Sequence, residues 1–157
     1  MANVLQSDVK RSVQHDTVVV SRTYSSPSSV IFQAFADVQV RTRWSVPPDE
    51  RIEYLESDFN VGGKDIFRCG PEMAYRGDVR YEDIVPDCRI VFTENLEKAG
   101  TRLSAALITF ELQPVDSGTR VVVTIQVAAL DGHQVAGGYR EGWAAVLECL
   151  AAEIHSD

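Results

Sequence analysis

The sequence predicts an α+β domain in which an antiparallel sheet of seven strands curves around one long helix at the C-terminal end of the chain. Three observations lead to this class. The middle of the chain is a succession of β-branched and alternating segments separated by turn residues. Only residues 132–154 show a sustained helical period, with their apolar side chains in one stripe. A single amphipathic helix that follows so many strands can bury this stripe only against the face of their sheet.

A strand and two short helices are expected before the rest of the sheet. Residues 1–15 show no sustained period and are expected to form a flexible segment, so the domain would cover residues 16–157. The β-branched run 17–24 predicts a strand. Ser25–Ser29 ends this strand, and its serines and proline favour a helix that begins with a serine cap. Asp37 is expected to cap a second short helix, which two consecutive prolines would end.

Six further strands are expected between these prolines and the long helix. Turn residues such as Gly62-Gly63 and Asp116-Ser-Gly118 join neighbouring strands by short connections. Strands joined in this way must pair antiparallel. The expected strands cover residues 51–59, 64–69, 74–85, 89–96, 103–113 and 119–129.

Alternation along the strands predicts which side chains face the long helix. In the segment 74–85, Tyr75 and Tyr81 alternate with the charged side chains of Arg76 and Arg80, which must face water. The same rule places aromatic side chains of other strands on the inner face. The interior is therefore predicted to be wide and rich in aromatic rings.

Two glycines in the long helix indicate that its packing against the sheet is incomplete. Gly138 and Gly142 lie one turn apart beside Trp143, so the helix lacks side chains near one end. A helix of this kind held against a curved sheet favours a binding cavity. The predicted cavity lining consists of ten mostly aromatic residues, namely Phe35, Trp44, Phe67, Tyr75, Tyr81, Phe92, Phe110, Tyr139, Trp143 and Leu147.

Composition argues against several kinds of partner. The formal net charge of -8 disfavours nucleic acid and anionic membrane surfaces, both of which select basic proteins. Cys69, Cys88 and Cys149 are too few and too scattered for a disulfide framework. Neither a signal peptide nor an apolar run of bilayer length is present, so a cytoplasmic location is expected.

No motif predicts a catalytic or metal centre. The three histidines share no ligand spacing, and no nucleophile motif or phosphate-binding loop occurs. Glu141 is expected to face water. Asp65 could lie at the cavity rim if it shares the face of Phe67, most simply as a solvated or ion-paired carboxylate. No catalytic residue, cofactor or metal is therefore predicted.

Several short motifs follow one another along most of the chain. They are Ser21–Tyr24 with Ser26-Pro27, Arg43–Pro47, Asp58–Gly63, Tyr75–Gly77 with Ile84–Pro86, Arg89–Thr93, Gly118–Arg120 and Glu141–Trp143. In this succession the chain resembles the SRPBCC (START-like, helix-grip) superfamily, and within it the AHSA1-like subgroup, similar to the C-terminal domain of the activator of Hsp90 ATPase. The resemblance implies the helix-grip form of the α+β fold. It implies several functions, because the superfamily binds lipids, hormones and polyketides, performs cyclase or dehydratase chemistry, or contacts chaperones.

Three functional hypotheses remain open at this point. The leading one is the binding of a small hydrophobic molecule in the cavity, without a catalytic centre. The second is a cyclase or dehydratase that acts on a polyketide-like substrate, and an inward carboxylate within reach of a tyrosine hydroxyl would favour it. The third is an interaction module that contacts a chaperone or forms a homodimer, and a filled interior with a large external apolar patch would favour it.

Overall fold

The computed structural model describes residues 12–155, and in these residues it confirms the predicted α+β fold. None of the helices within this range is long and apolar enough to cross a membrane. The elements in chain order are β1 (Val13–Tyr24), α2 (Ser28–Ala36), α3 (Val38–Trp44), β2 (Ile52–Ser57), β3 (Lys64–Cys69), a 3₁₀ turn η1 (Pro71–Met73), β4 (Tyr75–Val85), β5 (Arg89–Lys98), β6 (Thr101–Val115), β7 (Gly118–Leu130) and α4 (Ala136–Ile154).

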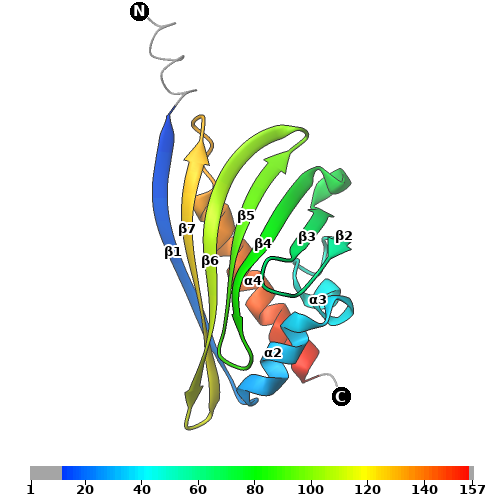
Figure 1. The fold of residues 1–157 in the computed structure, drawn as a ribbon, viewed down its shortest axis with the longest axis vertical. Coiled ribbons are helices and arrows are strands. Elements are labelled where there is room, and N and C mark those ends of the chain that lie inside the picture. Colours follow the sequence, from blue (N-terminus) through cyan, green and yellow to red (C-terminus); the bar gives the residue numbers. More distant parts are fainter. Residues whose placement is uncertain (1–11, 156–157) are drawn as a thin grey trace, which may run out of the picture.

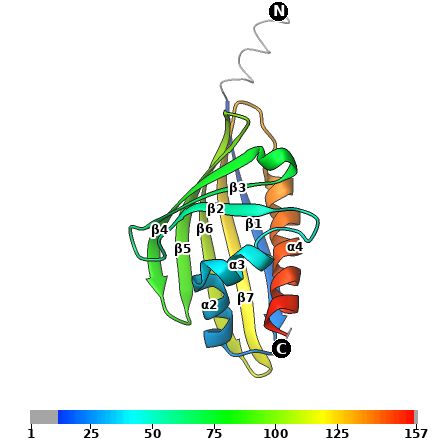
Figure 2. The ribbon, with the colours of Figure 1, turned by 90° about the vertical axis from the view of Figure 1, so that its right-hand side faces the viewer.

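The seven strands form one sheet in the order β1-β7-β6-β5-β4-β3-β2, and every neighbouring pair is antiparallel. Strands β2 to β7 follow one another as hairpins, whereas β1 crosses to the far edge and pairs with β7. The sheet curves, and α4 runs along its inner face (Figure 1). Helices α2 and α3 cover the same face beside the C-terminal end of α4 (Figure 2).

The element bounds follow the sequence expectations closely, with two informative differences. β1 begins at Val13, where the chain already pairs with Leu130, and residues 1–11 of the expected flexible segment lie outside the described residues. α4 begins at Ala136 rather than at residue 132. Asp131 and Gly132 have φ angles of 54° and 78°, so they form a turn that a right-handed helix cannot include.

Capping distinguishes the two short helices. The prediction for Asp37 is confirmed, because its carboxylate accepts hydrogen bonds from the backbone N–H groups of Gln39 at 2.9 Å and Val40 at 3.4 Å. The predicted serine cap of α2 is wrong. Pro27 occupies the cap position without a side-chain hydrogen bond, and the Ser28 hydroxyl lies 3.2 Å from the hydroxyl of Thr119 on β7 instead.

The C-terminal half of α4 is the part that packs firmly on the sheet. Val146, Leu147 and Leu150 are buried there in the common core. The Tyr24 hydroxyl, at the end of β1, donates a 2.6 Å hydrogen bond to the backbone carbonyl of Leu147. Burial raises the pKa of Tyr24 well above its ordinary value, so this hydroxyl stays protonated and remains a donor. The helix is thus anchored at one end and free to leave space at the other.

Replacing Tyr24 with phenylalanine tests this anchor. The change removes the hydrogen bond to Leu147 without removing the ring, so the free energy of unfolding should fall by about 1 kcal/mol. The measurement is denaturant unfolding followed by circular dichroism. Tyr75→Phe is the matched control, because the Tyr75 hydroxyl makes no hydrogen bond within residues 12–155. Equal unfolding free energies for the two variants would show that the bond to Leu147 contributes nothing.

Candidate functional site

A cavity of about 830 Å³ lies between the N-terminal half of α4, the sheet and the connection from α3 to β2. Apolar and aromatic side chains make up most of its wall, which is typical of sites for small organic molecules. Eight of the ten residues predicted to line a cavity lie on this wall: Phe35, Trp44, Phe67, Tyr75, Tyr81, Phe92, Tyr139 and Trp143.

The two remaining residues, Phe110 and Leu147, belong to the packed core instead. Phe110 is 0% exposed because the rings of Phe35 and Trp143 cover it, with ring centroids 5.1 and 6.3 Å away. Leu147 is 1% exposed and lies beside the anchor formed with Tyr24. The prediction that they line the cavity is therefore wrong. Alternation identified their inward direction but not the depth at which packing ends.

Glycines create part of the free space. Gly138 and Gly142 both line the cavity, and a Cβ atom added to either would meet no atom within 4 Å. Gly77 on β4 has the opposite role. A Cβ atom at this position would lie only 2.1 Å from the ring of Phe67 on the neighbouring strand β3. The first pair leaves the helix surface open, and Gly77 allows an aromatic ring of the wall to lie flat against the sheet.

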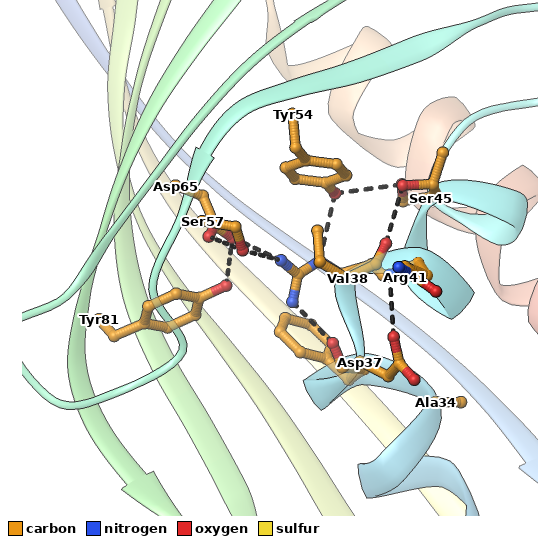
Figure 3. A network of polar contacts seen from close by, with 12 residues as sticks. Ala34, Asp37, Val38, Arg41, Ser45, Tyr54, Ser57, Asp65 and Tyr81 are labelled. Atoms are coloured by element: carbon orange, nitrogen blue, oxygen red, sulfur yellow. Dashed lines mark hydrogen bonds and ion pairs between the residues drawn. The ribbon is translucent and has the colours of Figure 1, made fainter.

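A buried ion pair is part of the cavity wall, and Figure 3 shows the contacts that it makes. The guanidinium of Arg41 on α3 donates a hydrogen bond of 2.8 Å to the carboxylate of Asp65 on β3, and both residues are 3% exposed. Arg41 also donates to the backbone carbonyl of Phe35 at 2.6 Å. Because both charges are out of water, each depends on the other and on the neighbouring dipoles.

Hydroxyl groups satisfy the rest of this network (Figure 3). Asp65 accepts two further hydrogen bonds, from the Ser57 hydroxyl at 2.8 Å and from the Tyr81 hydroxyl. Arg41 donates to the Tyr54 hydroxyl at 3.2 Å. Burial lowers the pKa of Arg41, but Tyr54, Tyr81 and Asp65 raise it by more, so the guanidinium remains charged. Tyr81, predicted to line the cavity, therefore has its hydroxyl already bonded to Asp65.

A second inward carboxylate lies on the same cavity wall and has far fewer partners. Glu94 on β5 is half-buried and accepts a hydrogen bond of 2.8 Å from the Tyr139 hydroxyl on α4. Among residues 12–155, no lysine, arginine or histidine nitrogen lies within 4 Å of its carboxylate. Burial raises the pKa of Glu94, and the Tyr139 hydrogen bond lowers it only in part. Glu94 and Tyr139 are therefore a polar pair inside a mostly apolar space.

The other reactive side chains near the cavity offer little chemistry. Burial, with the charges of Glu94 and Glu50, raises the pKa of Cys69 to about 11, so its thiol is protonated and a poor nucleophile at neutral pH. His133 also lines the cavity, from the connection between β7 and α4, three residues before the helix begins. Within residues 12–155, no three histidine, cysteine or carboxylate side chains are grouped to hold a metal ion.

Sequence reasoning missed Arg41 and Glu94, although each left a signal. Arg41 lies three residues before Trp44, so in a helix both must share one face. Phe92 is predicted to line the cavity, and the same period of two along its strand brings Glu94 inward. Charged side chains are rarely buried, so neither residue stands out from the sequence as an inward candidate.

Arg41→Ala tests the buried ion pair. The variant leaves the Asp65 carboxylate buried without its cation, so the free energy of unfolding should fall by about 3–5 kcal/mol. Arg43→Ala is the matched control on the same helix, because Arg43 pairs with Glu153 at the exposed surface and should hardly affect stability. Denaturant unfolding of both variants measures the difference. Similar small losses would contradict a structural role for the buried pair.

Glu94→Gln tests the burial of the second carboxylate. A raised pKa means that the folded protein holds the Glu94 proton more tightly than the unfolded chain does. The stability that this proton contributes is complete below the ordinary pKa of 4.5. It is lost as the pH rises through the pKa of the folded state. Glutamine can still accept the Tyr139 hydrogen bond and has no proton to lose. In urea unfolding, the variant should therefore gain stability relative to the wild type as the pH rises above the ordinary value of 4.5. Parallel pH profiles would contradict the burial.

Comparisons with known proteins agree with this architecture. The family model described as activator of Hsp90 ATPase homolog 1-like protein matches residues 25–155. No curated protein matches the chain. The solved structure of the Mll3558 protein from Rhizobium loti is 41% identical, with a TM-score of 0.83 and coverage of 91% of this chain and 99% of that one. Protein CV1439 from Chromobacterium violaceum is 27% identical, with a TM-score of 0.77 and coverage of 90% and 98%. The resemblance noted in the sequence is thus confirmed, and the chain belongs to the family of activator of Hsp90 ATPase homolog 1-like proteins.

Proposed function

We propose that this protein binds a small, mostly apolar molecule in the cavity between α4 and the sheet. The observation that carries the proposal is the cavity of about 830 Å³, whose wall is largely aromatic. Two glycines of α4, Gly138 and Gly142, line it and leave space where other residues would have side chains. Its size lies within the range of known ligand pockets. A space of this kind would be expected to close by packing if it served stability alone, because empty volume in a core is destabilising.

Apolar burial would supply most of the affinity. Each Å² of apolar surface removed from water contributes roughly 25 cal/mol. The half-buried rings of Trp143 and Phe67 offer such surface to a ligand. Tyr75 adds another ring to the wall, and the Lys98 ammonium lies 5.2 Å from the centroid of this ring. The ionic wall at Asp65 is already satisfied by protein donors, so it would contribute shape rather than charge.

The second candidate function is a proton-transferring enzyme of the cyclase or dehydratase kind. The Glu94–Tyr139 pair favours it, because a carboxyl group within reach of a tyrosine hydroxyl inside an apolar cavity is suited to general acid–base work. Asp65 and Tyr81 form a similar pair, but Arg41 and Ser57 saturate that carboxylate. The third hypothesis, an interaction module, has less support. It predicts an interior filled by side chains, whereas this interior contains a cavity.

The binding test compares two glycine substitutions in α4. Pyrenylmethanol, a neutral apolar fluorophore, should bind the wild type, and Gly142→Leu should weaken its binding about tenfold because the new side chain would occupy the cavity. Gly137→Leu is the matched control. It makes the same change in the same helix, but Gly137 does not line the cavity, and its Cβ would also meet nothing within 4 Å. Fluorescence titration measures both affinities.

Two results would count against the proposal. The first is the absence of pyrenylmethanol binding to folded wild-type protein, and the second is equal loss of affinity in the two leucine variants. Mass spectrometry of the purified protein under native conditions would then identify any small molecule that is retained from the cell. A retained molecule should be displaced by pyrenylmethanol if both occupy the cavity.

A further inference from the structure

The cavity wall contains two carboxylates that differ in how the protein satisfies them. Asp65 receives hydrogen bonds from a guanidinium and two hydroxyls, so the chain itself provides both the countercharge and the donors. Glu94 receives one hydrogen bond, from Tyr139, and no cationic nitrogen of residues 12–155 lies within 4 Å of it. Even a half-buried carboxylate loses part of its hydration, and this loss is costly without such partners. The second oxygen of Glu94 is therefore available to a donor from outside the chain.

The surroundings of Glu94 favour a positively charged donor. Lys98 lies on the same strand, but its ammonium is placed over the ring of Tyr75 rather than against the Glu94 carboxylate. The residues across from Glu94 in the sheet are Ala106 on β6 and Val79 on β4, and neither side chain can donate a hydrogen bond to the carboxylate. Among the described residues that line the cavity, four carboxylates stand against two permanently cationic side chains: Glu50, Asp65, Glu94 and Glu141 against Arg41 and Lys98. This balance attracts cations.

Tyr139 holds the Glu94 carboxylate in place. Its hydroxyl donates to one carboxylate oxygen, Oε1, and leaves the other oxygen without a hydrogen bond from the described residues, in a side chain that lines the cavity. The Ser104 hydroxyl is buried close to Tyr139 and lowers the pKa of its phenol, although burial and Glu94 raise that pKa by more. The Tyr139 hydroxyl thus remains protonated and oriented toward Glu94. A positioned carboxylate of this kind suits a charge-assisted hydrogen bond.

We propose that Glu94, oriented by Tyr139, binds a protonated amine carried by the otherwise apolar ligand. This inference rests on the proposed binding function and narrows it to a class of ligand, an apolar body with one amine. The protonated amine would give Glu94 a positive charge and a hydrogen-bond donor, as Arg41 does for Asp65. The aromatic wall and the two glycines of α4 would accommodate the apolar body.

The experiment uses three probes with the same apolar body and different polar groups: pyrenylmethylamine, pyrenylmethanol and pyrenecarboxylic acid. Fluorescence titration of the wild-type protein at neutral pH should rank them amine, alcohol, acid, with the amine about tenfold tighter than the alcohol. Glu94→Gln should remove most of this preference while leaving the alcohol nearly unchanged. Circular dichroism should show that the variant is folded, because the substitution keeps the size of the side chain.

Glu97→Gln is the matched control. It makes the same change of charge on the same strand, but Glu97 does not line the cavity, so the preference for the amine should persist. Equal binding of amine and alcohol to the wild type, or an amine preference that survives Glu94→Gln, would overturn the inference and leave the binding function intact. Failure of all three probes to bind folded protein would instead contradict the binding function itself, and the inference with it.

Discussion

The ion pair between Arg41 and Asp65 determines how the short helix α3 meets the sheet. Both side chains are 4% exposed, and they join a helix to the second strand from the sheet edge. A buried pair of this kind adds little stability over an apolar contact of the same shape, but removal of one partner is strongly destabilising. The pair therefore acts as a geometric constraint. It places Trp44, whose indole N–H donates to the Ala34 carbonyl at 3.0 Å, on the wall of the cavity.

With α3 fixed in this way, the interior divides into a packed part and an open part. The C-terminal half of α4 is joined to the sheet through Tyr24, Leu147 and Leu150. The ring of Phe35 on α2 packs against Phe110 of the sheet in the same core. The N-terminal half of α4 presents Gly138 and Gly142 to the sheet and leaves the cavity. One helix thus provides both the stability of the core and the opening of the binding space. The two carboxylates of the wall also differ. Asp65 accepts hydrogen bonds from three protein groups, whereas among residues 12–155 Glu94 accepts only one.

Local chemistry explains why most of the fold could be predicted from the sequence. Glycine and proline turns separated the strands, and β3 was expected at residues 64–69, as observed. The Asp37 cap was also a local feature that three or four residues determine. The first residue of α4 was harder to predict. The turn before it depends on a positive φ at Asp131, and a positive φ at a residue other than glycine cannot be predicted from composition.

The site was predictable only in part, because its decisive contacts join distant segments. Alternation could say that Phe110 points inward, but not that Phe35 would cover it. The pairing of Arg41 with Asp65 spans 24 residues, and that of Glu94 with Tyr139 spans 45. A period of two could have placed Glu94 on the inner face, yet the usual exposure of glutamate argued for the surface. Charged residues that lie on an apolar face of a strand or helix are therefore worth treating as inward candidates in related chains.

The most direct test of the account is a crystal structure determined under xenon pressure. The central claim is that the interior beside α4 is an open, mostly apolar space and not a core that packs shut. Xenon occupies apolar cavities of this kind. We expect anomalous density beside Gly138, Gly142 and Trp143. Side chains of Trp143 and Tyr139 closed into this space, with no xenon bound there, would contradict it.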